Sequence, residues 1–255
     1  MTLSPGQVST RGVAMGAGIS AFPISSMDLF GTPDPTFVDV KRSDRGLLSG
    51  AGSEGGRQVQ VVAWLNAWPE TTELLADRAR LAAAWRPQGG EDQLIFCLDE
   101  DQLTYFGQCR GADFVMGDNG EGTDVWEVTC DFMASDPRPF YDEVSVTINA
   151  TPTTISNTGA EPGIWRYTVG PCVHPVLTIG SWVLSFPALT VPSGKTMVVS
   201  SRRRSVTIGG LDRSGYAMNG SKPAILIQLP PGNSAVSHTA SSGATTADFT
   251  YRLTP

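Results

Sequence analysis

Two prolines separated by one residue interrupt the chain near its middle, and this feature most constrains the fold. Pro137 and Pro139 each lack a backbone donor and fix their φ angle, and Pro137 also pushes Asp136 towards an extended conformation. A strand ladder cannot pass through such a pair unless the strand lies at a sheet edge. Alternating apolar and polar residues, typical of strands, occur both before and after the pair. We therefore interpret Asp131–Tyr141 as a joint between two domains.

The predicted joint consists of Asp136, Pro137, Pro139 and Tyr141, and it divides the chain into domains 1–141 and 142–255. A length of 255 residues suits two domains, each able to bury its own core. With 28 glycines, 18 prolines and only 17% charged residues, the composition indicates many turns and short strands.

Charge and hydropathy limit the partners that we expect. The formal net charge is -7, which gives no reason to expect binding to a polyanion. The N-terminus lacks a basic start followed by an apolar run, so we expect no secretory signal. Apolar stretches stay well short of the ~18–20 residues that a membrane span requires. We expect a soluble protein made in the cytoplasm, without membrane insertion.

The first domain is predicted to combine strands with one helix. Arg57–Leu65 alternates as a strand, and Asp92–Leu98 and Leu103–Cys109 read as a hairpin across a polar turn. Phe37–Lys41 favours another strand, and the glycine-rich stretch Gly46–Gly56 is typical of a mobile hairpin tip or arm. This pattern indicates an α+β domain.

The helix is predicted over residues 69–86, starting at a proline, which the first helical position tolerates, and ending before Pro87. Leu74, Leu81 and Trp85 recur at helical spacing and form its predicted core face. An apolar stripe of this kind is far more often a core face than a cofactor site.

The second domain shows alternating runs separated by turn signals and no helical pattern. Roughly eight strands at this spacing indicate an antiparallel sandwich. The runs are Val144–Ile148, Trp165–Val169, Val176–Ile179, Trp182–Phe186, Thr196–Val199, Ser205–Ile208, Ala224–Gln228 and Phe249–Leu253. The predicted fold class is therefore mainly β, with an N-terminal barrel-like sheet and one helix followed by a C-terminal antiparallel β-sandwich.

The sequence does not contain a recognisable catalytic or metal-binding motif, so we expect no enzyme, no cofactor and no metal. His174 and His238 are its two histidines and lie far apart in the chain. The acidic turn 99–101 is more often simply solvated than a metal site. Four cysteines form no CxxC pair; buried reduced thiols are favoured, and a Cys109–Cys130 bridge remains an alternative.

From about residue 37 onwards, the order of elements resembles the distal tail (Dit) protein family of long-tailed, non-contractile bacteriophages. In the first half, the matching features are the glycine-rich arm, the strand Val59–Leu65, the helix with Pro87, and the closing Asp136-Pro137-x-x-x-Tyr141. In the second half they are Ser156–Gly163 leading into Trp165–Val169, then Pro175–Gly180, Leu229–Asn233 and Tyr251–Leu253. Residues 1–35 match the family poorly.

The resemblance implies structural work in a virion rather than catalysis. Such minor tail proteins form homo-oligomeric rings, usually hexamers, that join the tail tube to the tail-tip hub or baseplate. It implies a tail tube protein, a tape-measure protein and a hub protein as partners, and DNA that passes through the channel without specific binding. It places the protein at the virion tail tip, and the second domain would resemble galectins and carbohydrate-binding modules.

Two other functions are weighed against the adaptor. A host-surface carbohydrate-binding module is the alternative, with Trp165, Trp182 and Tyr216 as candidate glycan-contact aromatics. Their places in or near alternating strands favour a core role for these rings. A cell-wall hydrolase would rest only on the acidic residues 99–101.

Overall fold

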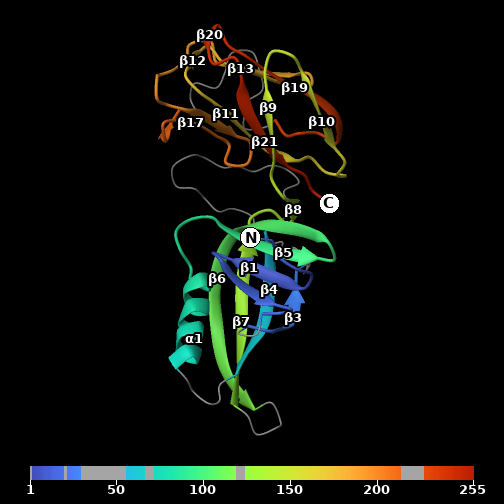
Figure 1. Cartoon of the computed structure of the whole chain (residues 1–255), viewed down its shortest axis with the longest axis vertical. Coiled ribbons are helices and arrows are strands. Elements are labelled where there is room, and N and C mark those ends of the chain that lie inside the picture. Colours follow the sequence, from blue (N-terminus) through green and yellow to red (C-terminus); the bar gives the residue numbers. More distant parts are fainter. Residues whose placement is uncertain (1, 20–21, 30–55, 67–71, 119–123, 214–226) are drawn as a thin grey trace. The chain divides into compact units, whose positions relative to one another are not determined.

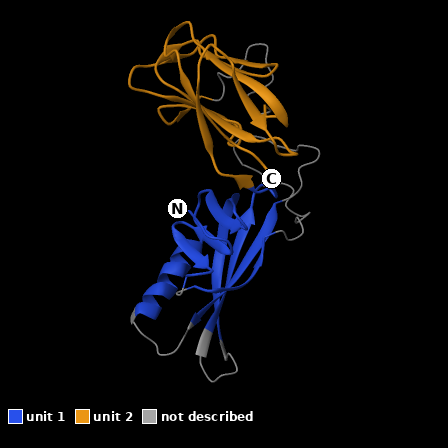
Figure 2. Cartoon of the chain, turned by 45° about the vertical axis from the view of Figure 1, so that its right-hand side comes forward, with its two compact units in different colours: residues 1–139 blue, residues 140–255 orange. Residues whose placement is uncertain are grey.

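The computed structural model of the chain describes residues 2–19, 22–29, 56–66, 72–118, 124–213 and 227–255. The chain forms two compact units, residues 1–139 and 140–255 (Figure 2). The predicted strand Phe37–Lys41, nearly all of the glycine-rich stretch Gly46–Gly56, and most of Ala224–Gln228 lie outside the described residues.

Unit 1 is one antiparallel sheet with a helix packed on it. Its sheet has the strand order β2-β1-β5-β6-β7-β4-β3, and α1 lies along β6 (Figure 1). Its elements are β1 (Gln7–Thr10), β2 (Val13–Gly16), β3 (Ile24–Asp28), β4 (Arg57–Asn66), α1 (Thr72–Trp85), β5 (Asp92–Leu98), β6 (Asp101–Asp118) and β7 (Asp124–Ala134).

The long pair β6–β7 forms the centre of unit 1. It runs in register from Gly107↔Ala134 to Asp118↔Asp124, with one bulge between Cys109 and Gly111. Residues 128, 130, 132 and 134 of β7 are buried, and so are residues 59, 61, 63 and 65 of β4. These alternate positions share one face, and that face forms the core side of the sheet.

The predicted elements of unit 1 are confirmed where apolar alternation is strong. β4 and β5 coincide with the predicted strands almost residue for residue, whereas β6 continues to Asp118, well beyond the predicted end at Cys109. β1, β2 and β3 were not predicted. The N-terminal residues therefore contribute the β1–β2 hairpin at one end of the sheet and β3 at the other.

Arg11 anchors the β1–β2 hairpin to the rest of unit 1. It occupies the tight turn between the strands with φ 47°. Its guanidinium donates two bonds to the Asp92 carboxylate, at 2.8 and 2.6 Å, and others to the carbonyls of Ala84 and Arg86, at 3.1 and 2.7 Å. Asp92 also accepts a bond from the backbone N–H of Cys109. One side chain thus satisfies helix C-terminal carbonyls and joins three elements.

Apart from β8, the strands of unit 2 are short and lie in three antiparallel sheets of the described residues. Their orders are β10-β19-β13-β14, β18-β17-β16-β11-β21-β9 and β15-β12-β20. The elements are β8 (Phe140–Tyr141), β9 (Val144–Ile148), β10 (Thr153–Asn157), β11 (Ile164–Val169), β12 (Cys172–Val173), β13 (Val176–Ile179), β14 (Trp182–Ser185), β15 (Thr190–Val191), β16 (Met197–Ser200), β17 (Ser205–Ile208), β18 (Leu211–Asp212), β19 (Gly232–Thr239), β20 (Ser242–Gly243) and β21 (Ala247–Arg252).

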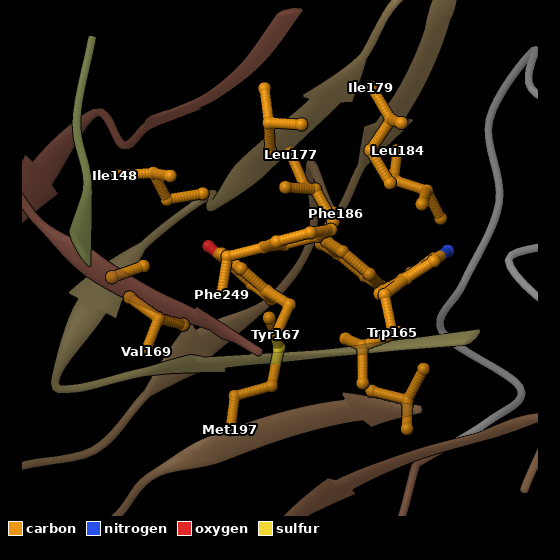
Figure 3. Packing of buried hydrophobic residues seen from close by; sticks show 14 of the residues in the cluster. Ile148, Trp165, Tyr167, Val169, Leu177, Ile179, Leu184, Phe186, Met197 and Phe249 are labelled. Atoms are coloured by element: carbon orange, nitrogen blue, oxygen red, sulfur yellow. The ribbon is translucent and has the colours of Figure 1, made fainter. Parts of the chain in front are cut away.

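A continuous apolar core lies within unit 2. Figure 3 shows Trp165, Tyr167, Phe186 and Phe249 gathered at its centre, with aliphatic side chains around them. Trp165 and Phe249 stack with ring centroids 5.8 Å apart. Together with the sheet and single described helix of unit 1, this arrangement confirms the predicted mainly β fold class.

A buried polar pair lies inside this apolar core. The Tyr167 hydroxyl lies 2.7 Å from Nδ1 of His238, and Nε2 of His238 lies 3.1 Å from the Ala244 carbonyl. Because a carbonyl can only accept, Nε2 carries the proton and Nδ1 accepts from the tyrosine. The pair is fully satisfied, which is what allows two polar groups to remain in the core.

Candidate assembly surfaces

The predicted joint residues lie in a locally tied turn. Asp136 accepts two bonds from the Arg138 guanidinium, at 2.9 and 2.8 Å, and one from the Arg138 backbone N–H. Pro137 is buried, Pro139 and Tyr141 are half-buried, and the Tyr141 N–H bonds the Leu253 carbonyl within unit 2. Their role as a rigid joint stays a prediction.

Helix α1 uses the predicted face for packing. Leu81 and Trp85 are fully buried, whereas Leu74 is half-buried. The helix spans Thr72–Trp85 in the described residues, and residues 69–71 of the predicted helix lie outside them. The two C-terminal positions of the stripe are therefore the stronger core contacts.

The candidate glycan aromatics do not form a surface platform. Trp165 is only 2% exposed, its indole N–H donates to the Ile227 carbonyl at 2.9 Å, and its ring packs on Phe249. The suggestion that Trp165 contacts a glycan is therefore wrong, because strand alternation turns its ring into the core. Trp182 is half-buried against the same core, and Tyr216 lies outside the described residues.

One exposed apolar surface, which we name the helix–hairpin patch, consists of Leu75, Arg78, Phe114, Met116 and Trp126. The Arg78 guanidinium lies 5.1 Å from the centre of the Phe114 ring and 4.4 Å from that of Trp126. Met116 is the register partner of Trp126 and is 57% exposed, and Leu75 is 49% exposed. Leu75 and Arg78 are helix neighbours because they lie three residues apart. The strand predicted from sequence alternation ends at Cys109. The prediction therefore does not include the part of β6 that forms this surface.

The opposite face of the same strands, which we name the acidic face, carries Asp28, Asp113, Glu127 and Asp131. Register places them together: Asp28 pairs with Gln60, which pairs with Asp131, while Asp113 pairs with Thr129. Trp64 and Val115 flank Glu127 on this face, and Val115 is 62% exposed. The positions of β3, β4 and β7 that share this face hold no lysine or arginine among the described residues. On β6, Arg110 is exposed in the bulge, next to Gly111, the register partner of Asp131.

Two buried thiols and a buried tyrosine are held neutral rather than activated. Burial raises the pKa of the Cys109 and Cys130 thiols in unit 1 and of Tyr167 in unit 2. All four cysteines are free thiols and buried, which confirms the favoured interpretation over a Cys109–Cys130 bridge. Buried thiols with raised pKa are poor nucleophiles. Burial also lowers the pKa of Arg252, although Glu143 opposes the shift.

The remaining concave and acidic features do not converge into a chemical site. A hollow beside β2 and β3 is lined by Gly, Ser, Pro, Met and small apolar residues without a titratable side chain. Asp99, Glu100 and Asp101 are exposed at the β5–β6 turn. In the described part of the chain, no three His, Cys, Asp or Glu side chains cluster as metal ligands would. The described helix is too short and too polar to cross a bilayer.

The fold as a whole has counterparts among solved structures. Neither a protein-family profile nor a curated protein sequence matches this chain. The crystal structure of the phage SPP1 Dit protein, described as a paradigm of the hub adsorption apparatus in phages that infect Gram-positive bacteria, aligns with a TM-score of 0.62 and 17% identity over 98% of each chain. A chain of the phage P2 baseplate in its activated conformation with calcium aligns with a TM-score of 0.53 and 9% identity over 97% of each chain. The chain therefore shares its fold with the SPP1 Dit protein, which confirms, at the level of the fold, the resemblance predicted from the sequence.

Proposed function

We propose that the chain is a structural protein of a bacteriophage tail tip, a ring-forming adaptor between the tail tube and the tail-tip hub. The observation that carries the proposal is the likeness to the SPP1 Dit protein, which extends over 98% of both chains and so includes both units. A match restricted to one sheet would fit many unrelated proteins, because common β architectures host many functions.

The surfaces of unit 1 support this role. The helix–hairpin patch and the acidic face are of opposite charge, and their residues lie on α1 and the sheet rather than on loops. A closed ring forms when one surface of each copy binds a different surface of the next. The proposal assigns the chain a hexameric ring, contacts with tube, tape-measure and hub proteins, a place at the virion tail tip, and no catalysis.

The carbohydrate-binding alternative is not proposed. Sugar sites use aromatic rings on open surface, and Trp165 is instead stacked in the core of unit 2. Along the six-stranded sheet β18-β17-β16-β11-β21-β9, the inward positions hold the aromatic side chains Trp165, Tyr167 and Phe249. No observation in the described residues favours glycan binding over scaffolding.

Light scattering coupled to size exclusion tests the proposal on the purified full-length chain, together with negative-stain images of the same fractions. We expect a discrete oligomer whose mass is a multiple of 27.1 kDa, and images of rings with a central opening. A chain that stays monomeric at every concentration, and that forms no ring when mixed with its tail partners, would overturn the proposal.

A further inference from the structure

The two exposed surfaces of unit 1 carry charges that the chain itself leaves unpaired. Among the described residues, Arg78 makes ring contacts with Phe114 and Trp126 and no ion pair with a carboxylate. Asp28, Asp113 and Glu127 likewise lack a cationic partner in the described part of the chain, and Asp131 accepts only from Gln58 and Gln60. Opposite charges therefore remain available on the two surfaces.

The composition of the helix–hairpin patch is that of a protein interface. Aromatic residues, methionine and arginine are enriched at interface cores relative to the rest of a protein surface. Arg78 is held over two rings, so its side chain is already ordered before a partner arrives. Beside it, Met116 is 57% and Leu75 49% exposed to solvent. An occupant of this patch would bury apolar area and meet one fixed positive charge.

Strand register places the complementary surface on the other side of the same hairpin. Phe114 and Met116 pair with Val128 and Trp126 on the helix side, whereas Asp113 and Val115 alternate with them and point to the opposite side. A copy that binds through its helix–hairpin patch therefore keeps its own acidic face open for the next copy. This is the geometry of a head-to-tail contact that repeats around a ring.

We propose that the helix–hairpin patch of one copy binds the acidic face of a second copy of this chain. Arg78 then faces the carboxylates around Asp113 and Glu127, while Met116 and Leu75 pack on Val115 and Trp64 of the neighbour. This assignment rests on the proposed ring-forming function and deepens it by naming the two surfaces that meet. Charge complementarity also fixes the direction of assembly, because like surfaces repel one another.

Charge insertion in the full-length protein tests the first surface. Met116→Glu is expected to weaken self-assembly by about tenfold or more, because it places a negative charge opposite the acidic face. Leu211→Glu is the matched control, since Leu211 is 64% exposed in unit 2 and lies outside both surfaces. The readout is the dissociation constant from concentration-dependent light scattering, with thermal unfolding recorded for each variant.

Charge reversal tests the pairing itself. We expect assembly to weaken in the single variant Arg78→Glu and also in the double variant Asp113→Lys, Glu127→Lys. A chain that carries all three changes should recover part of the lost affinity. A second measurement keeps the test independent of folding. Assembly of the variant with all three charge reversals should weaken as the salt concentration rises, as assembly of the wild type should.

The outcomes separate this inference from the proposed function. A wild-type chain that assembles, with Met116→Glu or the double lysine variant assembling within about threefold of it, overturns the pairing and leaves the ring intact. Full assembly with only the acidic face reversed would also overturn it, and would favour that face lining a channel instead. A wild-type chain that never assembles overturns the proposed function together with this inference.

Discussion

The two units of this chain are both mainly β but stabilise themselves in different ways. Unit 2 encloses the side chains of Trp165, Tyr167 and Phe249, which are at most 2% exposed. Unit 1 leaves Phe114 and Trp126 half-buried and Met116 largely exposed along its longest hairpin. Short strands that close into a sandwich bury their apolar face completely, whereas a hairpin that extends beyond its covering helix cannot. Our proposal that copies of the chain assemble through unit 1 builds on this difference.

The largest expected effect sharpens this comparison in unit 2. Trp165→Ala should lower the free energy of unfolding of unit 2 by about 3–5 kcal/mol, because it removes a fully buried ring and its hydrogen bond. Hydrogen exchange read on peptides of each unit would measure the loss in unit 2 and unchanged protection in unit 1.

Trp182→Ala is the control, since Trp182 is only half-buried and should cost about 1–2 kcal/mol. Equal, small losses for both variants would show that Trp165 is not a core residue and would restore it as a surface candidate.

The next effect tests the polar anchor of unit 1. Arg11→Met should lower the free energy of unfolding of unit 1 by about 2–4 kcal/mol, because it leaves the Asp92 carboxylate, 10% exposed, without its cation and uncaps α1. Chemical denaturation with the same peptide-level readout would measure it.

Arg204→Met provides the matched control for Arg11. Both arginines adopt a positive φ, 47° and 51°, but Arg204 is exposed in unit 2. Its replacement should change the free energy of unfolding by less than about 0.5 kcal/mol. Similar losses at the two positions would contradict the anchoring role.

A pH series gives a third, smaller effect. Burial raises the pKa of Tyr167 above its ordinary value of 10.0, so the folded state keeps the proton that the unfolded state releases. The stabilisation is complete below about pH 10 and is lost at up to about 1.4 kcal/mol per pH unit as pH rises towards the folded-state pKa. Tyr167→Phe should flatten this part of the decline in unit 2.

Only the slope above pH 10 bears on that prediction. The Tyr167→Phe variant also leaves Nδ1 of His238 without a donor, which lowers stability at every pH. Parallel alkaline declines for the wild type and the variant, measured by urea denaturation, would refute the contribution of Tyr167.

The joint should give the smallest effect on stability. Replacing Pro137 and Pro139 with glycine should leave both units folded and change their free energies of unfolding by about 1 kcal/mol or less. If the joint is rigid, images of assembled particles should show a blurred unit 2 in the variant. A unit 2 as sharp as that of the wild type would show that the segment is a simple linker.

The sequence predicted the elements whose apolar residues alternate, and it missed those whose inward positions are polar or small. In β19, Ser234, Val236 and His238 point inward, so only one of three core positions is apolar. Its hydrogen-bonding partners lie far away in sequence, as Tyr167 does for His238. β1 was missed for a related reason, because Gln7, Ser9 and Thr10 are buried there.

The candidate surfaces were harder to predict than the fold. The helix stripe at Leu81 and Trp85 was visible from its spacing alone. The helix–hairpin patch depends on how far β6 and β7 pair beyond the helix and on Arg78 reaching across to them. Neither property is encoded in the local pattern of the residues involved. Met116 of β6 lies on the same face as the buried residues of β7, and only its exposure in the folded chain distinguishes it from them.

The central claim is that self-assembly resides in unit 1 and not in unit 2. Two exposed leucine and valine side chains allow a matched test: Leu75 in unit 1 is 49% exposed and Val183 in unit 2 is 46% exposed. Native mass spectrometry of the full-length chain would compare Leu75→Glu with Val183→Glu. The account predicts that Leu75→Glu shifts the protein towards monomers while Val183→Glu keeps the wild-type oligomer. An oligomer that survives Leu75→Glu and is lost on Val183→Glu would contradict it.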